Sequence, residues 1–318
     1  MAEASITPKI EKINKKTRRW KKFKNQKYLQ IMAIVGVVWM LIFQYIPMAG
    51  IIIAFKRYNI ASTIFNAQWV GLKYFKQFFV DDQIPLVIKN TLGISFYKLI
   101  IGFPLPILFA LLLNELKNVK YKKVVQTVTY LPHFLSWVVL GGIMMNWMDM
   151  TGLLTKLCVG MHIIPKATNM IGIPSYFWAI VVSSDIWKEL GWNAIIYLAA
   201  ITSIDQEMYE AATIDGAGRF QKMFKITLPC IKPTIAILLI LAVSGLLNSN
   251  FDQIFVLRNN LNIDASNVLD IYVYKTGIAN LQYSYATAVG LLKSVVALIL
   301  LLSANFVTKK LNDNTSVL

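Results

Sequence analysis

The chain has 318 residues, of which 56% are hydrophobic and only 15% are charged, and its mean hydropathy is +0.55. A soluble domain carries roughly 25% charged residues, so this chain has too few to cover a water-facing surface. The composition excludes a disordered chain, a collagen-like chain, a disulfide-stapled secreted domain and a nucleic-acid-binding globule. It indicates an all-α membrane protein with several spans.

The few cysteines and histidines predict no metal or disulfide chemistry. Cys158 and Cys230 fall in different segments, and His133 and His162 are isolated from one another. None of these spacings is that of a metal-binding motif or a disulfide framework. We therefore expect no metal site and no catalytic residue in this chain.

A basic N-terminal tail, residues 1–29, precedes the first apolar run and accounts for much of the net charge of +16. Such an excess can bind the phosphates of a nucleic acid. In a membrane protein it more commonly sets orientation and contacts anionic lipid headgroups. We expect the tail to contact membrane lipids and no nucleic acid.

Six apolar runs follow the tail, each long enough to cross a hydrocarbon core of roughly 30 Å. We expect helices over residues 31–55, 88–113, 124–147, 176–204, 233–257 and 285–307. Together they make a transmembrane domain over residues 30–310, followed by a short tail, residues 311–318. The first run is too long for a signal-peptide core and lacks a small-residue cleavage site, so we expect it to be retained as a helix.

Lys and Arg are shared unevenly between the two sides of these spans. If the N-terminal tail is cytoplasmic, 20 of the 32 Lys and Arg residues lie on that side, and at most nine lie on the other. The remaining three, Lys98, Lys188 and Lys293, fall within spans. The asymmetry predicts that both termini are cytoplasmic.

The loop between the fourth and fifth spans, residues 205–232, is the most informative segment. Ser203 and Gln206 have the spacing of a capping box, and helix-forming residues follow them. Gly216 and Gly218 suit a helix stop and a turn. A second helical stretch over residues 219–227 ends near Pro229. On these features alone, an amphipathic helix lying on the headgroups is an equally good interpretation.

The ordered letters of this loop are more specific than its helix signals. Glu210-Ala-Ala-x-x-Asp-Gly-Ala217 is followed by Ile226, Leu228-Pro229 and Pro233. This pattern, between two spans and on the basic side, resembles the EAA loop of binding-protein-dependent ABC importer permeases. The stretches Tyr130–Val139 and Asp185–Ala200 are similar to the carbohydrate-uptake permeases. Within these, the chain is most similar to the polysaccharide and oligosaccharide branch, and it resembles the maltose permease subunits more distantly.

This resemblance implies a six-helix type I ABC importer permease with a cytoplasmic coupling helix in a bacterial cell membrane. The coupling helix would dock on an ATPase dimer, with Glu210 as a charged contact, Ala211 and Ala212 as the close-packed face, and Gly216 as the turn. The expected coupling residues are Glu207, Glu210, Ala211, Ala212, Asp215, Gly216 and Ala217. The resemblance further implies a second permease, an extracytoplasmic solute-binding lipoprotein and an oligosaccharide substrate.

Charged and aromatic residues of the fourth and fifth spans are candidates for the solute pathway. Ionisable groups within spans usually face the bundle interior or a wet cavity, and aromatic rings, carboxylates and amides suit the faces and hydroxyls of sugars. The candidates are Asp185, Trp187, Lys188, Glu189, Asn193, Tyr197, Asn248, Asn250, Phe251 and Asp252. A structural ion pair or a gate explains the charges equally well, with Lys98 and Lys293 as partners of Asp185 or Glu189.

Three other functions are weighed against this one. A secondary transporter or channel would need an internal repeat or a charge relay, and no clear repeat is visible. A membrane-embedded enzyme would need a nucleophile–base or metal set. An ABC permease for a non-sugar solute is the nearest alternative. The chain has no phosphate-binding Gly-x-x-x-x-Gly-Lys-Ser/Thr loop, so ATP and Mg²⁺ would be bound by the separate ATPase and this chain would hold no cofactor.

Overall fold

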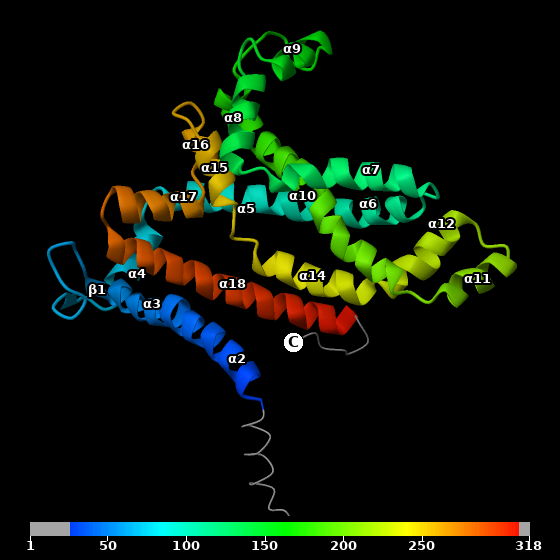
Figure 1. Ribbon diagram of the computed structural model, residues 1–318. Helices are drawn as coiled ribbons and strands as arrows, with labels where there is room; N and C mark the ends of the chain where they lie inside the picture. The colour runs from blue at the N-terminus through cyan, green and yellow to red at the C-terminus, as the bar shows by residue number, and fades with distance from the viewer. Residues whose placement is uncertain (1–25, 312–318) are drawn as a thin grey trace, which may run out of the picture. The chain divides into compact units, whose positions relative to one another are not determined.

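The computed structural model describes residues 26–311 (Figure 1). Most of the basic N-terminal tail and nearly all of the C-terminal tail therefore lie outside the described residues. The chain divides into two units, residues 1–53 and 54–318, and each is considered by itself.

The first unit contains the first span. It consists of α2 (Lys27–Met40), the π-helical turn η1 (Leu41–Tyr45) and α3 (Ile46–Met48), and it leads into the 3₁₀ segment η2 (Ala49–Phe55). None of the residues of α2, η1 and α3 is buried, although almost all are apolar. Apolar side chains that stay unburied along a helix are expected of a segment surrounded by lipid.

Within the described residues, the regular structure of the second unit is helical apart from a two-stranded antiparallel ribbon, β1 (Lys56–Arg57) and β2 (Gln68–Trp69). The helices up to the predicted fourth span are α4 (Lys73–Val80), α5 (Ile84–Tyr97), η3 (Lys98–Gly102), α6 (Pro104–Asn114), α7 (Val119–Tyr130), η4 (Leu131–Phe134), α8 (Trp137–Trp147), α9 (Leu153–Gly160), η5 (Met170–Gly172) and α10 (Pro174–Thr202). The helices beyond it are α11 (Gln206–Ile214), α12 (Arg219–Lys222), η6 (Met223–Thr227), α13 (Leu228–Cys230), α14 (Lys232–Ser244), α15 (Phe251–Leu257), α16 (Ile263–Ser266), α17 (Leu269–Tyr274), η7 (Lys275–Ala279) and α18 (Tyr283–Leu311).

Three helical stretches among the described residues are long and apolar enough to cross a membrane, namely 27–55, 84–114 and 283–309. Two bent pairs, 119–134 with 137–147 and 219–230 with 232–244, raise that number to five if each pair is one span. Helix α10 has 29 residues, but Asp185, Lys188 and Glu189 lie in its middle. Its length suits a span, and its charges require a polar environment within the protein.

Two of the expected continuous helices are broken. In the third span the chain turns by 100° between η4 and α8, where Pro132 is the second residue of the short η4 turn and Ser136 caps α8. In the fifth span α14 ends at Ser244 and α15 begins only at Phe251. Gly, Asn and Ser are frequent in that interval, and these residues are weak helix formers. The side chains of Asn and Ser also compete for backbone hydrogen bonds.

Helix α10 lies at the centre of the second unit and contributes to two apolar clusters. One cluster surrounds Phe177, Val181 and residues of α8 and α15, and the other surrounds Ala194, Tyr197 and residues of α6. Gly191 allows α7 to approach α10 closely, because a Cβ atom there would collide with the Thr129 carbonyl group. The charged middle of α10 lies between the two clusters.

Candidate functional site: a polar cavity and a coupling loop

The charged middle of α10 faces a cavity of about 210 Å³. Its wall is made by the second span, by α10 and by the end of α14 with the residues that follow it. The lining residues are Ser95, Lys98, Leu99, Gly102, Phe103, Pro106, Asp185, Ile186, Glu189, Leu190, Asn193, Ala242, Gly245, Leu246 and Asn248. A second hollow of about 160 Å³ shares Gly102, Phe103, Pro106, Asn193 and Ala242 with the first and continues to Tyr197.

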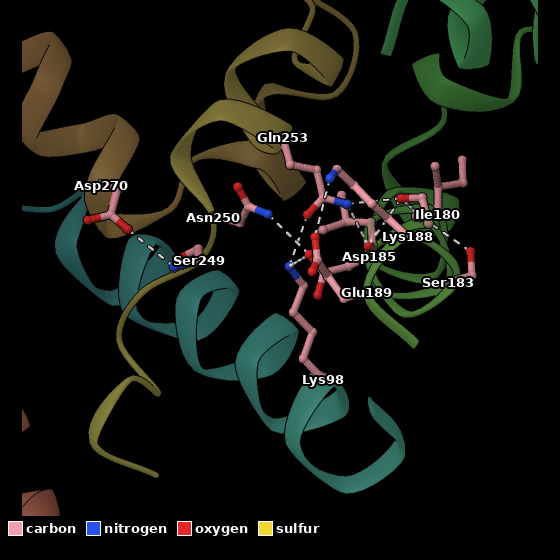
Figure 2. A network of polar contacts seen from close by, with 12 residues as sticks. Lys98, Ile180, Ser183, Asp185, Lys188, Glu189, Ser249, Asn250, Gln253 and Asp270 are labelled. Atoms are coloured by element: carbon pink, nitrogen blue, oxygen red, sulfur yellow. Dashed lines mark hydrogen bonds and ion pairs between the residues drawn. The ribbon is translucent and has the colours of Figure 1, made fainter. Parts of the chain in front are cut away.

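Lys98 of η3 ties the second span to α10 and α15 at the cavity wall (Figure 2). Its ammonium lies 3.0 Å from Asp185 Oδ1 and donates to Gln253 Oε1 at 2.9 Å. The Gln253 amide in turn donates to the Val181 carbonyl and to the Ser184 hydroxyl, at 2.8 and 2.9 Å. Because Gln253 is fully buried, its polar groups need partners within the protein, and these contacts supply them. The expected pairing of Lys98 with Asp185 is therefore present.

A second polar group joins α10 to the bend in the third span. Lys188 is 5% exposed and donates to the His133 carbonyl at 2.6 Å, while its ammonium lies 3.3 Å from Glu189. The His133 ring contacts Glu189 at 2.7 Å and stacks on Trp192, with centroids 4.2 Å apart. At a bend, a backbone carbonyl loses its N–H donor within the helix. The buried ammonium of Lys188 supplies a replacement donor to the His133 carbonyl. The role of Lys188 is thus to hold this bend against α10.

The residues expected along the pathway separate into two groups. Asp185, Glu189, Asn193 and Asn248 line the first hollow, and Tyr197 lines the second together with Asn193. Neither hollow is lined by Trp187, Lys188, Asn250, Phe251 or Asp252.

Two members of this second group make other contacts or face outward instead of lining a hollow. Trp187 is half-exposed, and Phe251 stacks on Phe255.

Lys293, expected as a partner of Asp185 or Glu189, instead pairs closely with Asp270. That part of the expectation is wrong, because α18 brings Lys293 to α17 and not to α10.

Ser95 and Gln253 belong to this site although the sequence did not predict them, and Lys98 was predicted only as an ion-pair partner. Ser95 is the clearest omission, since its buried hydroxyl lines the cavity and has no hydrogen-bond partner among the described residues. A buried hydroxyl without a partner calls for a ligand or a water. A lone serine in an apolar span carries no signal in one sequence, so spacing alone could not have found it.

The loop after α10 forms two short helices joined by a turn. Helix α11 ends at Ile214, and Gly216 adopts a left-handed conformation with φ of 76°, as expected of a helix stop. Tyr209 Oη lies 2.9 Å from Thr227 Oγ1, and Lys222 donates to Thr213 Oγ1 at 2.7 Å. These contacts hold α11 against the segment that leads into α14.

The expected capping box at this loop is wrong. The N-cap of α11 is Asp205, whose carboxylate accepts from the Glu207 amide at 3.0 Å, while the Ser203 hydroxyl donates back to the Ala200 carbonyl. Ser203 belongs to the end of α10, because that helix runs through Thr202. The cap therefore moves two residues along the chain, to a side chain with the same capping chemistry.

The exposed surface of this loop contains several of the expected coupling residues and also large apolar side chains that were not among them. Glu207, Glu210, Ala211 and Asp215 are exposed. Ile214 is 87% exposed, Phe220 is 70% exposed, Phe224 is 52% exposed and Met208 is 45% exposed, so four large apolar side chains are exposed on the same loop. Exposed apolar side chains rimmed by charged ones are typical of a protein-binding surface.

A further polar cluster lies where the end of α4, α17 and the start of α18 meet. Tyr272 donates to Asp81 Oδ2 at 2.5 Å, Tyr285 donates to the same oxygen at 3.0 Å, and the Gln83 amide donates to Oδ1 at 2.9 Å. Burial opposes ionisation of Asp81, but these hydrogen bonds outweigh it and hold the pKa of the carboxyl below its usual value. Burial, with the Asp81 contact, raises the pKa of Tyr272 to about 12.

Residues 102–313 match the family of binding-protein-dependent transport system inner membrane components, and the chain belongs to that family. Among its relatives in Bacillus subtilis, it is 42% identical to Protein LplB over 91% of each chain. It is also 42% identical to the polygalacturonan/rhamnogalacturonan transport system permease protein YteP, over 96% of this chain and 94% of that protein.

A crystal structure of a bacterial ABC transporter involved in the import of the acidic polysaccharide alginate contains a similar chain. The TM-score is 0.83 at 38% identity, over 93% of this chain and 99% of that chain. A second structure of the alginate transporter, in complex with an alginate pentasaccharide-bound periplasmic protein, gives 0.84 at the same identity, over 94% of this chain and 100% of that chain. The type I importer permease fold implied by the EAA-like loop is thereby confirmed.

Proposed function

We propose that this chain is a permease subunit that carries an oligosaccharide, delivered by an extracytoplasmic binding protein, through the membrane in an ATP-driven importer. The observation that carries the proposal is the cavity between the second span, α10 and α14, in a chain of this family. Carboxylate, ammonium, amide and hydroxyl groups line it, including the unpartnered hydroxyl of Ser95. Such groups can replace the water around the hydroxyls of a sugar.

The first hollow alone, at about 210 Å³, is smaller than the roughly 300–1,000 Å³ of a site that encloses a small ligand, and the adjoining hollow of about 160 Å³ brings the pair only to the lower end of that range. A volume of about 210 Å³, extended by 160 Å³, suits half of a pathway. A second permease would supply the facing wall, as in the heterodimer that the family resemblance implies. Both termini would lie in the cytoplasm, with the coupling loop on that side.

The exposed face of α11 would receive an ATPase subunit. Glu210 provides a charge, and Ile214 and Phe220 provide apolar area on the same loop. Because Tyr209 and Lys222 fasten α11 to the segment before α14, a displacement of α11 would be passed to α14, which contributes Ala242 to the cavity wall. ATP and Mg²⁺ would be held by that partner.

Uptake by cells lacking the gene for this chain tests the proposal. Cells complemented with the wild-type chain should accumulate at least one labelled oligosaccharide from a panel of galacturonan, rhamnogalacturonan, alginate and arabinan fragments. Cells complemented with a Ser95→Val, Asn193→Leu chain should lose that uptake while the protein stays in the membrane. Equal uptake by complemented and uncomplemented cells across the panel would contradict an oligosaccharide substrate.

A further inference from the structure

The interval between α14 and α15, residues 245–250, is non-helical and forms part of the cavity wall. We call it the break segment. Gly245, Leu246 and Asn248 line the cavity, and Asn250 adopts a left-handed conformation with φ of 62°. Asn tolerates this region better than other non-glycine residues, but the conformation still costs free energy, which contacts to the surroundings must offset. Irregular backbone at membrane depth is tolerated where it lines a cavity or is buried in protein.

One side of the break segment is held by a carboxylate of α10. The Asn250 amide donates to Asp185 Oδ1 at 3.1 Å, and the same oxygen lies 3.0 Å from the Lys98 ammonium. Figure 2 shows Asn250 and Lys98 reaching this oxygen from different segments. Asp185 also lines the cavity, and its side chain is 20% exposed, so a solute in the cavity can reach it.

The other side of the break segment is held by a carboxylate of α17. The Ser249 backbone amide donates to Asp270 Oδ2 at 3.2 Å, and Asp270 is closely paired with Lys293 of α18. Ser249 is fully buried, and Asp270 is not among the residues that line the cavity. This second attachment is therefore shielded from a solute, in contrast to the one at Asp185.

We propose that the break segment is a gate. It stays attached at Ser249, and it is released at Asn250 when a sugar hydroxyl replaces the Asn250 amide as a hydrogen-bond donor to the Asp185 carboxylate. The hydroxyl donates to Asp185 in place of the Asn250 amide, so the carboxylate keeps a donor while the strained Asn250 loses the contact that holds it. Asn250 is thus a positioning residue, and Asp185 is the residue that contacts the substrate. The inference rests on the proposed function, because it assigns a sugar hydroxyl as the competing donor.

The gate itself is tested without any sugar. Cys158 and Cys230 are changed to Ser, Leu247→Cys is introduced at a buried position of the break segment, and the importer is copurified with its partner chains in nanodiscs. Labelling by a hydrophilic maleimide is then compared with and without Asn250→Gly, which removes the amide and tolerates positive φ. Labelling at least tenfold faster in the Asn250→Gly chain is expected. Equal rates, in a complex that copurifies normally, would overturn the gate.

Two further variants control this comparison. The measurement is repeated with Leu246→Cys in place of Leu247→Cys, so that the result does not depend on one substitution that could disturb folding. Asn280→Gly, at an exposed asparagine that follows η7, is the matched control and should leave the labelling rate unchanged.

The role of the sugar is read from the ATPase rate of the same complexes with the oligosaccharide panel and the binding protein. In the wild type the rate should rise with sugar, whereas Asn250→Gly should raise the sugar-free rate severalfold and reduce the further stimulation. Sugar-dependent stimulation unchanged by Asn250→Gly would refute the release step. Absence of stimulation in the wild type would refute the oligosaccharide substrate, and the labelling result would still decide the gate.

Discussion

Lys98 is the residue whose removal should most affect the cavity wall. Its side chain is 15% exposed, and its ammonium serves both Asp185 and Gln253. Lys98→Met leaves a carboxylate without its cation, and breaking a fully buried pair costs about 3–5 kcal/mol. The remaining exposure lowers the expected cost to about 1–3 kcal/mol. Thermal unfolding of the purified complex should show this loss.

A second substitution distinguishes the charge from the packing of the lysine stem. Lys98→Met combined with Asp185→Asn removes both charges, so it should recover part of the lost stability. Lys89→Met, at an exposed position of the same span, is the control and should leave the unfolding temperature unchanged. A double variant less stable than Lys98→Met alone would contradict the pairing.

Asp81 should make the stability of the second unit depend on pH. Its pKa is depressed in the folded protein, so the carboxylate contributes stability above its unfolded pKa of about 3.9. That contribution is lost as the pH falls through the folded pKa. Asp81→Asn should therefore unfold at a lower temperature than the wild type at pH 6, and the difference should shrink below about pH 4. A difference that stays constant across this range would contradict the assignment.

At the scale of elements, the close contact between α7 and α10 depends on one glycine. A methyl group at Gly191 would collide with the Thr129 carbonyl group and lie 2.8 Å from the Tyr130 ring, so α7 would have to move. Gly191→Ala should therefore reduce the yield of folded protein severalfold. Gly290→Ala in α18 meets no atom within 4 Å and should be neutral or slightly stabilising. Size-exclusion profiles of the two variants compare them directly.

Helix α11 provides a test of the proposed contact with an ATPase subunit. Glu210 is exposed on α11, and reversing its charge should break a contact with the ATPase, which typically costs about 2–5 kcal/mol for a buried interfacial pair. Glu210→Lys should abolish uptake while the protein remains in the membrane. Asp82→Lys makes the same charge change at an exposed residue between α4 and α5 and should transport normally. Normal uptake by Glu210→Lys would remove Glu210 from the coupling contact.

The sequence predicts apolar spans better than it predicts their interruptions. Hydropathy marks residues 233–257 as one run, because a leucine-rich stretch masks the Asn-Ser-Asn sequence at 248–250. The break is held by Asp185 and Asp270, which lie 65 and 21 residues away from their partners in that segment. Only the folded chain brings those carboxylates to the break.

The same limit applies to ion pairs. Acidic partners on α10 were expected for both Lys98 and Lys293, which is correct for Lys98 and wrong for Lys293. Charges within spans must find partners, but residue spacing does not say which helix supplies them. By contrast, the EAA-like letters, the helix stop at Gly216 and the charged middle of α10 can be identified from local pattern alone.

At the scale of the whole molecule, the chain has the features of one subunit of a larger transporter. Its cavity has the volume of a partial site, its coupling loop carries exposed apolar side chains, and it lacks a phosphate-binding loop in the printed sequence. In the proposed function, a second permease would complete the pathway, and an ATPase subunit would cover the loop and hydrolyse ATP. An importer of this kind should therefore show little ATP turnover until a loaded binding protein engages it.

The most direct test is copurification of this chain with the products of its neighbouring genes, followed by ATPase assays with the binding protein and neutral and acidic oligosaccharides. The account predicts a complex that contains a second permease and an ATPase, with turnover raised severalfold by at least one oligosaccharide together with the binding protein. A chain that purifies alone and transports solute without ATP would contradict it.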